Sequence, residues 1–238
     1  MRRVLITGGG TGIGNAIACA FYENGDNVVI AGRRQNVLER TAKDRMAYKR
    51  ADITIEADVE ALFDTSYDIV IANAGYGASG RVASLSLQDW KATLDVNLTG
   101  TFLTFRQALR VNPTVSRLIA IASTASLKGN ASVPAYTAAK HGVLGLVRSV
   151  ALDIAKKNGT CNAICPGFTD TNLAENAIKG LMQRFDMTRE LATAKVASGN
   201  PRGDLISPTE VAATALFLAS PGAASINGHA LSVSGGEI

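Results

Sequence analysis

The sequence has few metal-binding or redox-active side chains. It contains three cysteines and two histidines among its 238 residues. Cys161 and Cys165 form no CxxC pair with each other or with Cys19, and all three stand in apolar surroundings. Such thiols are usually small buried hydrophobic residues in a reducing compartment. The sequence therefore predicts no metal site.

Long apolar runs and a strong excess of one charge are also absent. The short apolar run after Met1-Arg2-Arg3 ends in a glycine cluster, too early for a signal peptide, and no stretch approaches the length of a membrane span. The net charge of +4 is spread along the chain without a basic run. We therefore expect a cytoplasmic protein with no membrane and no nucleic-acid partner.

Apolar residues make up 47% of the chain and are arranged as strand-like runs that alternate with helical patterns. The expected strands are Arg3–Thr7, Asn27–Ala31, Tyr48–Ala51, Asp68–Ala72, Arg117–Ala122, Thr160–Cys165 and Ala230–Val233. The expected helices are Asn15–Asn24, Gln35–Met46, Ile55–Phe63, Leu87–Leu109 and Ser132–Lys157. This alternation predicts the α/β class: a single doubly wound domain over residues 1–238, with a parallel sheet of about seven strands and helices on both faces.

One long segment departs from this alternation. Residues 171–207 are partly helical and mix charged with small residues. A segment of this size between two sheet strands is more often a functional lid than an idle loop. We therefore expect residues 171–207 to cover the substrate.

A glycine-rich loop follows the first expected strand. Its residues are Gly8, Thr11, Gly12, Ile13 and Gly14, within the run TGGGTGIG. Glycines let the backbone turn tightly and approach a pyrophosphate, while the N-terminus of the next helix supplies N–H donors and a positive dipole. The alternative is a tight turn that binds nothing. The position between a strand and a helix favours a dinucleotide site.

Three polar residues are expected to converge at the carboxyl edge of the sheet. Tyr136 and Lys140 stand four residues apart on one helix face, and Ser123 follows a buried strand. A ketone that receives a hydride needs a proton from a nearby acid, which Tyr136 can donate. We expect Lys140 to lower the tyrosine pKa and Ser123 to donate to the carbonyl oxygen. The alternative is an ordinary exposed helix pair beside a capping serine.

Together these features resemble the short-chain dehydrogenase/reductase family. The TGxxxGxG loop and the Ser…YxxxK pattern are typical of that family, and Asn97 matches its fourth active-site residue. The resemblance spans essentially the whole chain. It implies a Rossmann fold and an oxidoreductase that moves a hydride between a nicotinamide and a carbonyl or secondary alcohol. The catalytic residues that it implies are Asn97, Ser123, Tyr136 and Lys140.

The resemblance also implies cofactor contacts outside the glycine loop. An Asp-Ile pair resembles the family's adenine contact, an Asn-Ala-Gly motif follows the fourth strand, and an NxxxPGxxxT segment that starts at Asn162 holds the nicotinamide side. These further contacts are Asp52, Ile53, Asn73, Ala74, Gly75, Tyr136, Lys140, Pro166, Gly167, Thr169 and Thr171. Ser234 stands in the tail motif where the family usually has aspartate.

The residues after the second strand predict the cofactor's phosphate state. An acidic residue there binds the ribose 2′-hydroxyl of NAD, whereas arginine accommodates a 2′-phosphate. Arg33 and Arg34 occupy this position, and no carboxylate stands nearby in sequence. We therefore expect a preference for NADP(H) over NAD(H). The alternative is that both arginines merely solvate the start of a helix.

The substrate is less defined by sequence. The segment around the YxxxK motif and the expected lid look similar to reductases of 3-oxoacyl thioesters, which predicts a small carbonyl or alcohol substrate linked to CoA or to a carrier protein. A sugar, polyol or steroid dehydrogenase is the alternative within the family. A regulator that senses NAD(P) without catalysis is the alternative of another class. The resemblance further implies a homotetramer or dimer.

Overall fold

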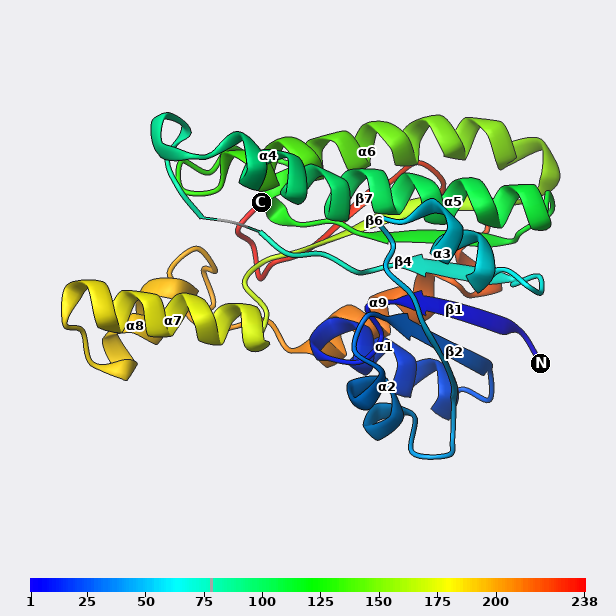
Figure 1. The fold of residues 1–238 in the computed structure, drawn as a ribbon, viewed down its shortest axis with the longest axis horizontal. Helices are drawn as coiled ribbons and strands as arrows, with labels where there is room; N and C mark the ends of the chain where they lie inside the picture. The colour runs from blue at the N-terminus through cyan, green and yellow to red at the C-terminus, as the bar shows by residue number, and fades with distance from the viewer. Residues whose placement is uncertain (78) are drawn as a thin grey trace.

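The computed structural model describes residues 1–77 and 79–238, and it shows one parallel sheet (Figure 1). The strands are β1 Arg3–Thr7, β2 Asn27–Gly32, β3 Ala47–Arg50, β4 Ile69–Ala72, β5 Arg117–Ile121, β6 Thr160–Pro166 and β7 Ala230–Val233. Their order is β3-β2-β1-β4-β5-β6-β7, and every neighbouring pair is parallel. The strand order reverses between β1 and β4, which is the doubly wound arrangement that the sequence predicts.

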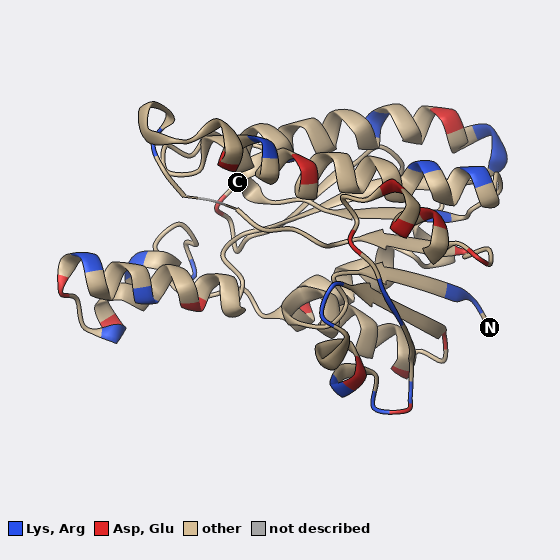
Figure 2. Ribbon diagram, in the orientation of Figure 1, with Lys and Arg blue, Asp and Glu red and all other residues tan. Residues whose placement is uncertain are grey.

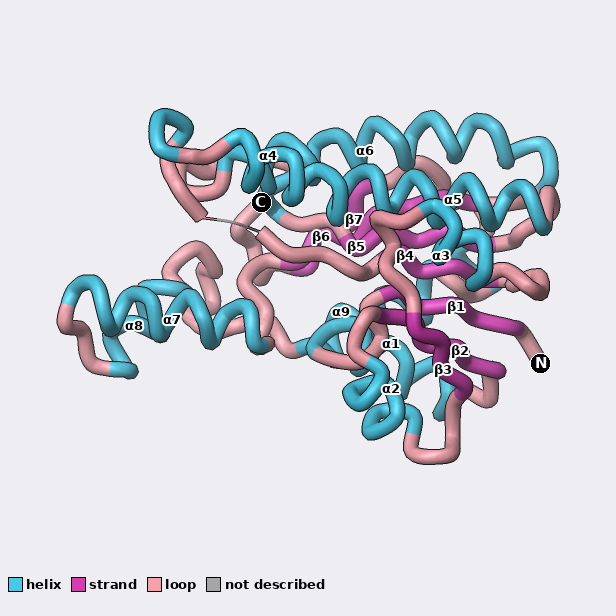
Figure 3. Tube along the Cα trace, viewed as in Figure 1, coloured by secondary structure: helices cyan, strands magenta, loops and turns pink. Residues whose placement is uncertain are grey.

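Helices cover both faces of this sheet (Figure 3). They are α1 Gly12–Glu23, α2 Gln35–Ala42, α3 Glu56–Leu62, α4 Leu87–Leu94, α5 Gly100–Val111, α6 Pro134–Ile154, α7 Asn172–Phe185, α8 Arg189–Ala197 and α9 Pro208–Leu218. Alternate residues of each strand face opposite sides. Val4 and Ile6 therefore pack against α1, α2 and α9, whereas Leu5 packs on the side of α3, α5 and α6.

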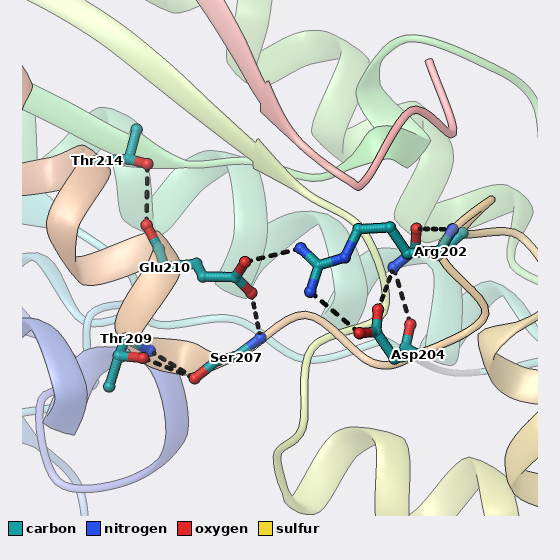
Figure 4. Close-up of polar contacts among 7 residues, drawn as sticks. Arg202, Asp204, Ser207, Thr209, Glu210 and Thr214 are labelled. Carbon is teal, nitrogen blue, oxygen red and sulfur yellow. Dashed lines mark hydrogen bonds and ion pairs between the residues drawn. The ribbon is translucent and has the colours of Figure 1, made fainter.

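Two helical segments differ from the sequence prediction. The expected helix Leu87–Leu109 forms, but a π-helical turn at Asp95–Thr99 divides it into α4 and α5. Helix α9 was not predicted, although its start carries clear signals. Ser207 and Glu210 form a capping box around this start (Figure 4). Pro208 stands in the first turn.

The expected lid forms a separate helical pair. Helices α7 and α8 lie to one side of the sheet in Figure 1 and share a small apolar core of Ile178, Ala192 and Val196. Figure 2 shows that basic and acidic residues alternate along the ribbon, including this pair. Within the part of the chain that the structure describes, no helix is both long and apolar enough to cross a membrane.

Candidate active site

The predicted site residues gather at the carboxyl edge of the sheet. The glycine loop follows β1, Asn73–Gly75 follow β4, Ser123 follows β5 and Gly167 follows β6. Because all these strands are parallel, their carboxyl ends meet at one edge, where doubly wound sheets bind ligands. The fold thus brings together segments that are far apart in sequence.

The glycine loop has the geometry of a phosphate cradle. Gly8 and Gly12 have φ values of +66° and +53°, in the left-handed region that favours glycine. A Cβ on Gly14 would lie 2.3 Å from the Gly8 oxygen, so the loop is closed tightly on the start of α1. The first turn of α1 contains no acidic side chain and leaves its positive end open to an anion.

Asn73 holds the glycine loop in place through hydrogen bonds. Its Nδ2 donates to the Thr7 oxygen at 3.0 Å and to the Gly8 oxygen at 3.1 Å. The backbone N–H groups of Asn73 and Ala74 donate to Thr7 Oγ1. A Cβ on Gly8 would lie 2.8 Å from Ala74 Cα. The amide of Asn73 therefore shapes the glycine loop, so this side chain supports the cofactor site through the loop's backbone.

At the expected adenine end, Arg33 and Asp52 approach each other. Arg33 Nη1 lies 3.9 Å from Asp52 Oδ2, and the arginine side chain is 71% exposed. Arg34 is exposed beside it at the start of α2. Ile53 turns its side chain into the core, where a Cβ on Gly100 would lie 2.4 Å from its Cδ1. An adenine in this place could contact Ile53 through the backbone, not through the side chain.

Lys140 and Tyr136 lie together on α6, as predicted. Lys140 is 3% exposed, and its Nζ lies 5.5 Å from the centre of the Tyr136 ring. The ammonium donates to the Ile121 oxygen at the end of β5, at 2.8 Å. Burial lowers the pKa of Lys140 to about 8. The lysine is therefore a destabilised cation held at the edge of the sheet.

The expected effect of Lys140 on Tyr136 is corrected by the structure. Burial raises the pKa of the Tyr136 phenol, and a hydrogen bond with Ser123 opposes this rise more weakly. The protein alone thus favours the neutral phenol, because desolvation outweighs the polar contacts. Ser123 also caps the turn after β5, where its Oγ accepts from the Ala125 N–H at 3.1 Å. Ser123 therefore both caps this turn and contacts Tyr136.

Asn97 sits in the π-helical turn with its side chain fully buried. Its Nδ2 donates to the oxygens of Tyr76 and Thr93. Its Oδ1 is buried and has no hydrogen-bond partner among the described residues. A Cβ on Gly75 would lie 2.7 Å from this oxygen and 3.6 Å from Lys140 Nζ. Asn97 and Lys140 thus face each other across a glycine that leaves a small space between them.

The segment after β6 folds back to the glycine loop. A Cβ on Gly12 would lie 3.1 Å from Thr171 Cγ2. Thr169 is buried and donates to the Gly167 oxygen, and Thr171 donates to the Thr169 oxygen. Pro166 ends β6 directly before this segment. The segment therefore borders the glycine loop at the start of α1.

Asn162 has a different place from the one expected. It is buried inside β6, where Nδ2 donates to the Ile226 oxygen and Oδ1 accepts from the His229 N–H. Both groups of its amide therefore join β6 to the segment that precedes β7. Asn162 holds the sheet that carries Pro166, and its amide is not directed to a cofactor.

The structure adds residues that sequence reasoning did not place at the site. Cys165 is buried beside the Ser123 backbone and the Lys140 ammonium, and burial raises its thiol pKa to about 11. A Cβ on Gly77 would lie 3.1 Å from the Tyr136 ring, so the loop after β4 covers the phenol. Their positions could have indicated this, because Gly77 follows β4 and Cys165 lies at the end of β6, at the same edge of the sheet.

This arrangement defines a class of protein. A doubly wound sheet with a left-handed glycine loop after β1 and a Ser–Tyr–Lys group at its carboxyl edge is the framework of a Rossmann-fold oxidoreductase. The two predicted parts, a nucleotide cradle and an acid–base group, lie at one edge of one sheet.

The comparisons identify the family. The family model described as enoyl-(acyl carrier protein) reductase matches residues 8–237. The chain is 31% identical over 252 residues to D-beta-hydroxybutyrate dehydrogenase of Cupriavidus necator, covering 100% of the chain and 98% of that protein. It is 32% identical over 250 residues to 3-oxoacyl-acyl-carrier-protein reductase of Synechocystis, covering 98% and 96%.

A solved structure agrees with these relatives. The crystal structure of a variant actinorhodin polyketide ketoreductase with NADPH superposes with a TM-score of 0.94 at 29% identity, covering 99% of the chain and 97% of that protein. The chain belongs to the short-chain dehydrogenase/reductase family. The predictions of a Rossmann fold and of an NAD(P)-dependent oxidoreductase are thereby confirmed.

Proposed function

We propose that this enzyme reduces the carbonyl of a 3-oxoacyl thioester with NADPH, and that Tyr136 is the general acid. The observation that carries the proposal is the convergence of Ser123, Tyr136 and Lys140 at the end of β5. The names of the relatives support this substrate class, since they include 3-oxoacyl-acyl-carrier-protein reductases and a ketoacyl reductase.

The residues present fit a dinucleotide cofactor. Gly8 and Gly12 hold the turn that a pyrophosphate needs, and Thr171 borders the same loop from the nicotinamide side. Pro166, Gly167 and Thr169 would line the nicotinamide side of the cofactor. When bound, NADPH would supply the hydride for reduction. The protein's part is to position the carbonyl and to supply the proton.

The direction of the Tyr136 pKa suits reduction. A phenol whose pKa is raised by burial is neutral at neutral pH, and it can donate its proton to the oxygen that becomes an alcohol. Ser123 would donate to the same oxygen and orient it. Lys140 is mostly protonated below its pKa of about 8, so its charge would favour the phenolate that remains.

Asn97 would complete a route for protons. Its buried Oδ1 and Lys140 Nζ lie on either side of Gly75. A water bound between them would accept from the lysine and donate to the asparagine oxygen. After Lys140 gives up a proton toward the Tyr136 phenolate, this water would pass a proton from solvent back to the lysine. This role gives a physical reason for a glycine at position 75.

Arg33 and Arg34 support the preference for NADPH. Both are exposed at the end of β2, and Arg33 is directed toward Asp52. A guanidinium can bind a 2′-phosphate through two parallel hydrogen bonds. A 2′-phosphate would replace the long contact of 3.9 Å with Asp52 by a shorter ion pair. We therefore expect a higher kcat/KM with NADPH than with NADH.

We further propose that the enzyme is a homotetramer or dimer that pairs through α5 and α6. Leu152 on α6 is 80% exposed, and Phe102 on α5 is 42% exposed. A Cβ on Gly145 would meet nothing within 4 Å, so α6 has room for a close helix neighbour. Burial of such apolar groups drives association. Light scattering should give at least a dimer, and a monomer at micromolar concentration would contradict this.

The central experiment follows NADPH absorbance with acetoacetyl-CoA for the wild type and for Tyr136→Phe. Loss of the proton donor should lower turnover by about 10²–10⁴-fold, while NADPH binding measured by fluorescence is retained. Crotonyl-CoA and a panel of sugars and steroids serve as competing substrates. Full turnover by Tyr136→Phe would refute the mechanism, and activity confined to crotonyl-CoA or another class would refute the substrate.

A further inference from the structure

An ion pair crosses the end of the site that lies farthest from the adenine region. Lys128 Nζ lies 2.8 Å from Glu237 Oε1. Lys128 belongs to the loop that follows β5 and carries Ser123, and Glu237 belongs to the tail that follows β7. Because β6 lies between β5 and β7, the pair bridges the carboxyl end of β6.

Glu237 fits closely against the backbone at this end. Its side chain is only 9% exposed. A Cβ on Gly167 would lie 2.8 Å from its Oε2, and a Cβ on Gly199 would lie 3.4 Å from its Oε1. Gly167 begins the connection to the lid, and Gly199 follows α8, the last lid helix. The carboxylate therefore contacts both the outgoing and the returning connection of the lid.

Polar contacts also fix the returning connection of the lid. Arg202 pairs with Asp204 and with Glu210 at the start of α9, as Figure 4 shows. Asn200 is buried and donates to the Asp204 oxygen. A Cβ on Gly235 would lie 2.0 Å from Asn200 Oδ1, so the tail packs directly on this connection. These contacts hold the tail in place, and we call its residues 234–238, which include Glu237, the end wall of the site.

The order of the strands places this wall on the substrate side. The predicted cofactor residues follow β3, β2, β1 and β4 from the adenine end, and those of the nicotinamide side follow β6. Ser123 follows β5 at the reacting end, and Lys128 stands five residues later in the same loop. Beyond the nicotinamide segment, the last position along the edge is the end of β7, where Glu237 in the tail pairs with Lys128. We therefore place the far end of a substrate that contacts Ser123 and Tyr136 on the side of this pair.

We propose that the Lys128–Glu237 ion pair closes the substrate cleft and restricts the acyl group to short chains. This inference rests on the proposed reduction of a 3-oxoacyl thioester. The bulky thioester carrier must extend into solvent, so the acyl end points toward the closed end. A long alkyl chain would have to displace or dehydrate the ion pair, which is costly for charged groups. A short acyl group ends before it reaches the pair.

The test compares acetoacetyl-CoA with the eight-carbon 3-oxooctanoyl-CoA in the wild type and in Glu237→Ala. The variant opens the end wall, and Glu237→Gln separates the loss of charge from the loss of volume. Asp64→Ala is the matched control, because it breaks the Lys49–Asp64 ion pair away from the site. Thermal melting confirms that each variant is folded.

The wild type should prefer the short substrate, and Glu237→Ala should raise the ratio of kcat/KM for the long over the short substrate by about tenfold. Asp64→Ala should leave this ratio unchanged. A folded Glu237→Ala variant with the wild-type ratio, or a wild type that prefers the long chain, would overturn the proposal.

A parallel series of ethyl 3-oxoalkanoates distinguishes this inference from the proposed function. Turnover of the esters but not of the thioesters would refute the thioester substrate, while the chain-length ratio of the esters would still test the wall. A wild type that reduces neither series would overturn both.

Discussion

Replacing Lys140 with methionine should stabilise the fold while it abolishes turnover. Burial lowers the pKa of Lys140 from its ordinary 10.5 to about 8, which corresponds to a cost of about 3 kcal/mol for holding the protonated amine in the fold at pH 7. Methionine removes this cost at similar volume. It also removes the hydrogen bond to the Ile121 oxygen, a loss of about 1 kcal/mol. The expected net gain in the free energy of unfolding is about 2 kcal/mol at pH 7.

The pH dependence gives this prediction a sharper form. Between about pH 8 and 10.5 the unfolded chain binds more protons at Lys140 than the folded chain does, so the wild type gains stability as pH rises through this window. The Lys140→Met variant lacks this gain, and its advantage should shrink as the pH approaches 10.5. Urea unfolding at fixed protein concentration measures the free energy of unfolding of the wild type and of the variant at each pH. A variant less stable than the wild type at pH 7, or a gain in stability that does not change with pH, would contradict this prediction.

Three further predictions concern the glycine beside Asn97, the cofactor and the fold. In Gly75→Ala the new methyl group would lie 2.7 Å from Asn97 Oδ1, which must shift, so kcat should fall by about 10–100-fold and the melting temperature should also fall. Gly222→Ala is its control, because the added Cβ meets Ser220 Oγ at an ordinary 3.5 Å, and equal kcat values for the two variants would contradict this reading. Arg33→Ala should lower kcat/KM for NADPH relative to NADH by about 10–100-fold, the value of a charged hydrogen bond, and an unaltered ratio would exclude Arg33 from phosphate binding. Ser207→Ala removes the cap of α9 and should cost about 1 kcal/mol in urea unfolding; a variant as stable as the wild type would show that the cap is dispensable.

The main features of the fold could be predicted because the sheet is buried on both faces. Its strands are continuous apolar runs such as Arg117–Ile121, bounded by helical patterns, and the structure places each expected strand in the sheet within a residue or two. Helix α9 was missed because its residues are apolar on most sides, without the polar face that marks a surface helix. The π-helical turn at Asp95–Thr99 was missed because a change from four- to five-residue spacing leaves no clear trace in the pattern of apolar residues.

The site was predictable in its residues but less so in its contacts. Spacing places Tyr136 and Lys140 on one face, and strand ends place Ser123 beside them. Spacing does not give burial, and burial decides that the Tyr136 pKa rises. The Glu237 contact with Lys128 joins segments more than a hundred residues apart, and neither residue belongs to a recognisable motif. Such a pair depends on how the chain crosses the sheet, which local sequence patterns do not show.

The rate of NADPH oxidation with acetoacetyl-CoA, compared between the wild type and Tyr136→Phe, tests most directly whether Tyr136 donates the proton. We expect rapid oxidation by the wild type, slower oxidation with NADH in place of NADPH, and near-complete loss in the variant while NADPH still binds. Oxidation by Tyr136→Phe at the wild-type rate would contradict the assignment of Tyr136 as the proton donor.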